Sequence, residues 1–144
     1  MPNCRTFLYL CGMKTNNADK WFSRFIRLRD AKQDDLGQCC TCGRWDNIKH
    51  MDNGHYIKRQ YKATRYHEKN CALQCKSCNN FEQGNDIKFR QYLVERYGEN
   101  AILMLESSKR TSVKRSTADL KQIENYYKRE VEKLLIEKGI KKWW

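Results

Sequence analysis

The chain has 144 residues, of which 40% are hydrophobic, and its 29 Lys and Arg against 17 Asp and Glu give a formal net charge of +12. This composition favours one domain with a small apolar core and an anionic partner such as nucleic acid, although charge alone does not separate DNA from RNA or a membrane surface. We expect a cytoplasmic protein with reduced cysteines, because the N-terminus lacks a basic start with a long apolar run and no stretch is long enough to span a membrane.

The first predicted elements are a short N-terminal segment, in which residues 6–10 suit a strand, and an amphipathic helix from about Ala18 to Ala31 with Asn17 as its N-cap. The apolar side chains of this helix recur at helical spacing: Trp21, Phe22, Phe25, Ile26 and Leu28. Its other face is basic and carries Lys20, Arg24, Arg27 and Arg29. We expect a core-packing helix with a solvated basic face, and this face also suits contact with DNA.

Two cysteine pairs of equal spacing flank the middle of the chain, Cys39-x-x-Cys42 and Cys75-x-x-Cys78. Four thiolates in two such pairs are typical of tetrahedral zinc ligation, and the pairs predict a structural zinc ion that closes the intervening chain into a loop. Cys40 competes with Cys39, but the two-residue gap mirrors the second pair and favours Cys39. The other cysteines are expected to be small buried hydrophobic residues: Cys4, Cys11, Cys40 and Cys71.

A turn at residues 34–37 and the first cysteine pair precede this loop, and the loop contains a strand that carries His55 and continues through Ile57. The connection after this strand is rich in cations, with tyrosines between them: Lys58, Arg59, Lys62, Arg65 and Lys69. Such a connection suits a phosphate backbone, with Arg65 as the preferred clamp. Basic loops are also common on any protein of this charge.

A helix is presumed to start just after Cys78 and to carry Asn79, and three further helices are predicted along the rest of the chain. The first begins at Gly84 or Asn85 and ends before Gly98, and the second runs from Glu99 to Glu106. A basic linker then leads to a long helix from about Thr117 to Lys138. Its apolar seam suits packing on the domain or against a second copy of the chain, and consists of Leu120, Ile123, Tyr127, Val131 and Leu134. The indoles of Trp143 and Trp144 are expected either to dock on the domain as apolar anchors or to form a surface for stacking.

His55, Asn70 and Asn79 have the order and spacing of a His-Asn-His nuclease motif in which asparagine replaces the last histidine. A neutral imidazole suits the activation of water, so His55 is the candidate general base, although a single histidine is more often structural. Asn70 is expected to pin the loop and orient the ring. His50 and His67 are reserve candidates.

Hydrolysis of a phosphodiester in such a site also uses a hard divalent ion, Mg²⁺ or Mn²⁺, which prefers oxygen ligands. The nearest candidates are Asp52 and the side-chain carbonyl of Asn79, with Glu82 and Asn85 as auxiliary ligands farther along the presumed helix. The motif places an acid or histidine directly before the catalytic histidine, where this chain has Gly54. The role of Asp52 therefore stays open.

We predict an α+β, mainly helical fold with a zinc-stapled ββα-metal core of the His-Me finger or HNH-like type, flanking helices and a long C-terminal helix. The expected division is an N-terminal segment at residues 1–16, an HNH-like nuclease domain at 17–108, and a basic linker with a helical extension at 109–144.

The sequence resembles the NinG/Rap family of recombination proteins from lambdoid phages over roughly residues 20–135. The resembling segments are residues 25–30, Cys39-x-x-Cys42-Gly43, Asp52-x-Gly54-His55-Tyr56, Arg65-Tyr66-x-Glu68-x-Asn70, Gln74-Cys75-x-x-Cys78-Asn79 and Gly84-Asn85. The order is also similar to the phage endonuclease VII group, in which the asparagine after the last cysteine helps to hold the catalytic metal. That second likeness implies metal ligation by Asn79, and Glu82 falls where the group has an acid.

The resemblance implies structure-selective cleavage of branched DNA, namely Holliday junctions and D-loops, with a divalent metal. Symmetric resolution of a four-way junction requires two active sites, so we expect a homodimer. Two alternatives remain: a less selective nicking nuclease of the same fold, and a non-catalytic zinc module that binds DNA.

Overall fold

The computed structural model describes residues 15–80 and 85–144, so the expectations for Cys4, Cys11, the strand at 6–10 and Glu82 lie outside the described residues. Helix α2 (Asn17–Asp30) leads into an antiparallel sheet of β1 (Ala31–Gln33), β2 (Leu36–Gln38) and β3 (Trp45–Asn47). The short helical turn η1 (Ile48–His50) precedes β4 (Asp52–His55), and η2 (Glu68–Asn70) precedes β5 (Cys71–Gln74), which pairs antiparallel with β4. The chain continues through α3 (Lys76–Asn80), α4 (Asp86–Tyr97), α5 (Glu99–Ser108) and α6 (Thr117–Lys138).

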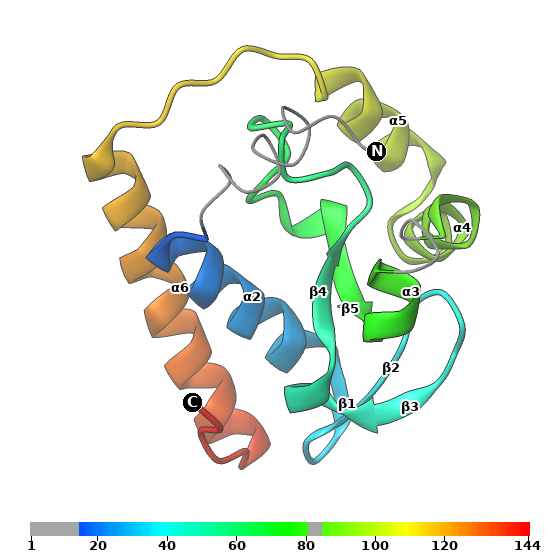
Figure 1. Cartoon of the computed structure of the whole chain (residues 1–144), viewed down its shortest axis with the longest axis vertical. Helices are drawn as coiled ribbons and strands as arrows, with labels where there is room; N and C mark the ends of the chain where they lie inside the picture. Colours follow the sequence, from blue (N-terminus) through cyan, green and yellow to red (C-terminus); the bar gives the residue numbers. More distant parts are fainter. Residues whose placement is uncertain (1–14, 81–84) are drawn as a thin grey trace, which may run out of the picture.

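Strand β5 is buried along its whole length and separates two apolar cores. Successive side chains of a strand point to opposite faces. Cys71 and Leu73 accordingly pack in the core that contains α2 and α6, whereas Ala72 packs with Phe89 of α4 and Ile102 of α5. Figure 1 shows the β4–β5 pair between these two groups of helices.

The apolar seam of α6 packs on α2 within the same chain, which is one of the two arrangements that the sequence allowed. Tyr127 lies against the rings of Phe22 and Phe25, with centroid distances of 4.8 and 5.0 Å. Val131 and Leu135 are buried in the same cluster. The seam therefore covers the apolar face of α2.

The C-terminal end of α2 joins three other elements through a buried carboxylate and an ammonium group. Asp30 accepts hydrogen bonds from Arg29, from Arg96 of α4 and from the backbone N–H of Leu73 in β5. Burial alone raises the pKa of Asp30, but the two guanidinium groups outweigh it and the pKa is lowered. Lys138 Nζ donates to the carbonyls of residues 28, 29 and 31 at 2.7–3.0 Å, so α6 caps the exposed carbonyl end of α2.

The α+β, mainly helical class is confirmed, and the long helix has the predicted bounds. The N-cap of α2 is Asn16 rather than Asn17, and it forms a capping box with Asp19. Three short strands, β1 to β3, were not predicted. Gly37 of β2 packs so closely on Leu73 and Ile48 that an added Cβ would overlap the Leu73 side chain. Among the described residues, no helix has the length and apolar character needed to cross a membrane.

Replacing Lys138 with Met should destabilise the fold by about 1.5–3 kcal/mol, because three carbonyls at the end of α2 lose a charged donor. Lys133→Met is the matched control on the same helix, since among residues 15–80 and 85–144 Lys133 forms only an exposed ion pair with Glu130, and its replacement should cost at most about 0.5 kcal/mol. Urea denaturation of both variants checks this. Equal losses in the two variants would contradict a specific role for Lys138.

Candidate functional site

A pocket of about 750 Å³ is lined by α2, β4, the residues after β4, and Asn79 of the short helix α3. It brings together His55, Asp52 and Asn79 with two of the predicted DNA-binding cations, Lys58 and Arg59. Three further cations reach it from α2, at positions 20, 24 and 27. The lining therefore has an excess of positive charge, since its acidic residues are Asp19 and Asp52.

His55 is the last residue of β4 and is held in one tautomer. Its Nε2 lies 2.9 Å from the backbone oxygen of Arg65. A carbonyl oxygen only accepts hydrogen bonds, so Nε2 carries the proton and Nδ1 is the basic nitrogen of the neutral ring. Burial lowers the pKa of His55 to about 4, and the charge of Arg59 adds to this against the opposing hydrogen bond to Arg65. The imidazole is therefore neutral near pH 7.

Asp52 and Asn79 are brought into contact by the pairing of β4 with β5 and by the short helix α3 that follows β5. Asn79 Nδ2 donates to Asp52 Oδ2 at 3.1 Å, and Lys76 Nζ donates to Asp52 Oδ1 at 3.1 Å. Two oxygen-bearing side chains thus adjoin each other at the pocket, a donor set that suits a hard divalent ion. Lys76 supplies the positive charge that balances the carboxylate, and Asn79 supplies a neutral hydrogen-bond donor.

A glycine is needed at position 54 because a side chain of the partner strand β5 occupies the space where its Cβ would lie. An added Cβ at this position would overlap the side chain of Gln74, which is directed to the same place from β5. Gln74 Nε2 in turn donates to Thr41 Oγ1 at 3.4 Å. The position before His55 is therefore filled from the neighbouring strand, and an acid or histidine there would displace Gln74.

Asn70 is fully buried and fixes the turn that follows His55. Its Oδ1 accepts from the Ile57 N–H at 2.7 Å, and its Nδ2 donates to the carbonyls of Ile57 and Thr64 at 2.9 and 3.1 Å. These bonds hold residues 57–64 in place. The next residue, Arg65, supplies the carbonyl that accepts from His55.

The Arg65 guanidinium is bound inside the protein by both carboxylate oxygens of Asp19, at 2.9 and 2.6 Å. This pair anchors the His55 loop to the first turn of α2. Lys62 and Lys69 are exposed and lie outside the pocket lining, as do the reserve residues His50 and His67 and the auxiliary candidate Asn85. Their roles in binding stay predictions.

Asn53 is a pocket residue for which the sequence predicted no role, and the α2 cations were predicted only as a basic face that suits contact with DNA. The basic face of α2 was visible in the sequence, but its orientation toward His55 was not. Asn53 lines the pocket next to Asp52, and its Oδ1 is buried without a hydrogen-bond partner among the described residues. No sequence signal separated it from other loop asparagines.

The four cysteines of the two pairs form one cluster, in which the sulfur atoms all lie within 4.8 Å of one another. Such a cluster can bind a metal ion such as zinc. Burial raises the pKa of Cys39, but hydrogen bonds from the backbone N–H groups of Cys42 and Cys75 outweigh it, so the pKa is lowered and the thiolate is favoured. The cluster includes Cys39 rather than Cys40, as the spacing indicated.

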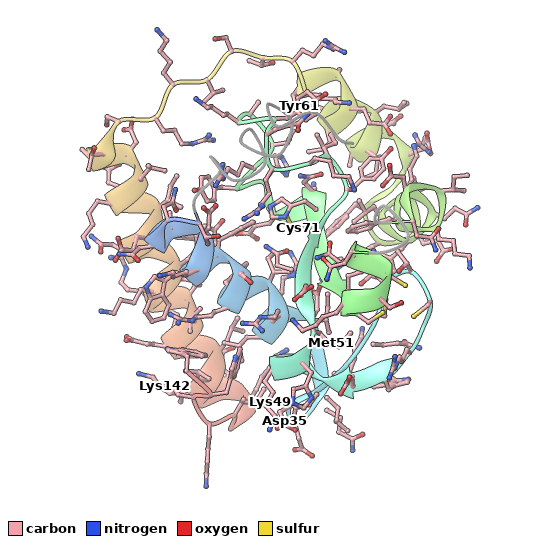
Figure 2. All side chains as sticks on the ribbon, in the orientation of Figure 1. Asp35, Lys49, Met51, Tyr61, Cys71 and Lys142 are labelled. Atoms are coloured by element: carbon pink, nitrogen blue, oxygen red, sulfur yellow. The ribbon has the colours of Figure 1, made fainter. Side chains whose placement is uncertain are left out.

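Cys40 and Cys71 remain outside this cluster. Burial raises the pKa of both thiols, which keeps them protonated. Cys71 is fully buried, near the middle of the molecule (Figure 2). Both fit the expected role of small, largely apolar side chains.

A model of the family described as "Bacteriophage Lambda NinG protein" matches residues 12–137. The chain is similar to Protein ninG of Escherichia phage lambda, with 34% identity over 92 residues that make up 63% of this chain and 43% of the relative. It is also similar to Protein ninG of Salmonella phage P22, with 31% identity over 118 residues, or 81% of this chain and 55% of the relative.

The chain thus spans about half the length of the curated relatives that it matches. No solved structure matches it significantly. The family match covers the cysteine cluster, the whole pocket and nearly all of α6. The chain therefore belongs to the bacteriophage lambda NinG protein family.

Proposed function

We propose that this chain is a divalent-metal-dependent DNA endonuclease that cleaves branched recombination intermediates, such as Holliday junctions and D-loops, in the host cytoplasm. One observation carries the proposal: a neutral histidine, a carboxylate and an asparagine side chain meet in one pocket with excess positive charge. The order β4, β5, α3, with His55 on the first strand and Asn79 on the helix, is also that expected of a ββα-metal core. The preference for branched DNA rests on the resemblance.

His55 is the proposed general base. The Arg65 carbonyl orients the ring, and Nδ1 takes a proton from the attacking water. The water oxygen forms a bond to phosphorus, the bond from phosphorus to the 3′ oxygen breaks, and the 3′ oxygen takes a proton from solvent. A neutral ring near pH 7 is ready for this role, because its lone pair is not already protonated. The products are a 5′-phosphate and a 3′-hydroxyl.

Asp52 and the side-chain oxygen of Asn79 are the residues that would hold Mg²⁺ or Mn²⁺, with Glu82 as a further candidate. When bound, the ion neutralises charge on the phosphate and on the leaving oxygen. The fit is supported by the contact between the two side chains, since a rotation of the Asn79 amide presents its oxygen instead of its nitrogen. Lys76 is exposed and free to leave the carboxylate.

A non-catalytic zinc module that binds DNA is the second candidate. It is favoured by the pairing of both Asp52 oxygens with N–H donors, of which the Lys76 ammonium balances the charge of the carboxylate. On this alternative the pocket cations bind a phosphate backbone and His55 is structural. A less selective nicking nuclease of the same fold is a third candidate, distinguished by its cleavage of linear DNA.

Replacing His55 with Ala should lower the rate of junction cleavage by about 10²–10⁴-fold, the usual contribution of a general base. The measurement is single-turnover cleavage of a labelled four-way junction and of a matched linear duplex, with Mg²⁺ or EDTA. His50→Ala is the matched control, because His50 is exposed and outside the pocket lining, and it should retain the wild-type rate.

Cleavage that is equally fast in His55→Ala would contradict the assignment of the base. Tight junction binding without cutting in any divalent metal would favour the binding module, and equal cutting of junction and duplex would favour the nicking nuclease.

Protonation removes the base only below its pKa of about 4, so the wild-type rate should not fall through loss of this base between pH 7.5 and 5.5.

The cysteine cluster is proposed to hold one structural zinc ion. Cys75→Ala should lose the ion and lower the melting temperature, because the ion joins the first cysteine pair to the start of α3. Elemental analysis and thermal denaturation measure this. Cys40→Ala, adjacent to the cluster but outside it, should keep one zinc per chain. Purified wild type without zinc, or loss in both variants alike, would refute the assignment.

Two copies are proposed to act on one junction, because symmetric cleavage of two strands requires two active sites. Since the seam of α6 is occupied by α2, other surfaces would have to join the copies. Light scattering of the junction complex in EDTA should give a mass of two chains per junction. A complex with one chain at saturation would rule out the dimer.

A further inference from the structure

The Arg24 side chain contacts two tryptophan rings that are far apart in the sequence. Its guanidinium carbon is 4.6 Å from the ring centroid of Trp21 on α2 and 4.4 Å from that of Trp144. The two indoles stand at 89° to each other with centroids 5.9 Å apart. Cation–π attraction thus restrains Arg24 on two sides.

The N–H groups of Arg24 remain available for a ligand. Among the described residues, the structure gives this guanidinium its ring contacts and no hydrogen bond or ion pair. Arg65 and Arg96, by contrast, are bound by carboxylates. Ring contacts use the faces of a guanidinium and leave its in-plane donors free, and these donors match the geometry of a phosphate.

Arg24 also lines the pocket that contains His55, between two other cations on the same helix. Lys20 and Arg27 lie four residues before it and three after it, so the three residues share one face of α2. Arg27 is itself restrained by the second indole of the tail, with 5.0 Å between its guanidinium carbon and the Trp143 ring centroid. Two consecutive residues of the tail after α6, Trp143 and Trp144, therefore each contact one arginine of this row.

We propose that Trp144, together with Trp21, positions Arg24 to bind a backbone phosphate of DNA beside the site of cleavage. Trp144 is a positioning residue here, because it acts through Arg24 and does not touch the DNA. Its exposure of 40% fits a ring that supports a surface cation more than one that fills a core. This inference rests on the proposed nuclease function, and it assigns to the tail a role in substrate binding.

The test is the affinity for a fluorescently labelled four-way junction, measured by anisotropy in EDTA so that binding is separated from cleavage. Trp144→Ala should weaken binding about three- to tenfold, the effect of losing one cation–π contact. Trp144→Phe, which keeps an aromatic face, should bind within about twofold of wild type. Trp45→Ala is the matched control: it removes an exposed tryptophan, on β3, that does not line the pocket, and should leave affinity unchanged.

Arg24→Gln should weaken binding and lower the slope of log affinity against log salt by about 1, as expected for one lost phosphate contact. In the Arg24→Gln background, Trp144→Ala should cause no further loss, because its partner is already absent. This double-variant comparison also separates positioning from a general effect on folding, which would persist in that background.

Additive losses from the two substitutions would overturn the inference and would instead indicate that Trp144 stacks on a base or stabilises the fold. Unchanged affinity of Trp144→Ala, in a wild type that binds and cuts junctions, would also overturn it and leave the proposed function intact. A wild type that binds no DNA would refute the proposed function and, with it, the inference.

Discussion

The buried carboxylate of Asp30 is the constraint on which the rest of the structure depends. It ends α2, accepts the backbone N–H of Leu73 in β5, and pairs with Arg96 of α4. An ionised carboxylate in an apolar interior is costly unless it is fully paired, so these partners are obligatory. Because β4 is in register with β5, fixing β5 against α2 also fixes the distance between α2 and His55. That distance defines the pocket.

The cysteine cluster and the pocket are connected through two side chains, Thr41 and Gln74. Thr41 Oγ1 lies 3.2 Å from Cys39 Sγ and accepts from Gln74, and Gln74 packs over Gly54 directly before His55. A movement of the first cysteine pair is therefore transmitted to the strand that carries the histidine. The proposed zinc ion would hold this connection in place, which gives a structural metal an influence on a site that it does not enter.

Features that depend on local chemistry were predicted well from the sequence. The cysteine spacing identified the cluster, the periodic apolar pattern gave the bounds of α6, and the resemblance to NinG is confirmed by the family match. Features that depend on contacts between distant segments were not predictable. The strands β1 to β3 are three residues long and too short to show alternation, and nothing in the sequence indicated that Asp19 binds Arg65, the predicted phosphate clamp.

The packing of α6 on α2 joins residues that lie about 110 positions apart, as in the contact between Lys138 and Leu28. During synthesis, α2 leaves the ribosome long before α6 is available to cover Phe22 and Phe25. The apolar face of α2 is therefore exposed in the nascent chain at a time when the cysteine cluster and strands β4 and β5 have already been synthesised. Helix α2, which forms one side of the pocket, is packed against α6 only after α6 has been translated. A chain that stalls earlier on the ribosome would carry His55, but α2 on the opposite side of the pocket would not be held in place by α6.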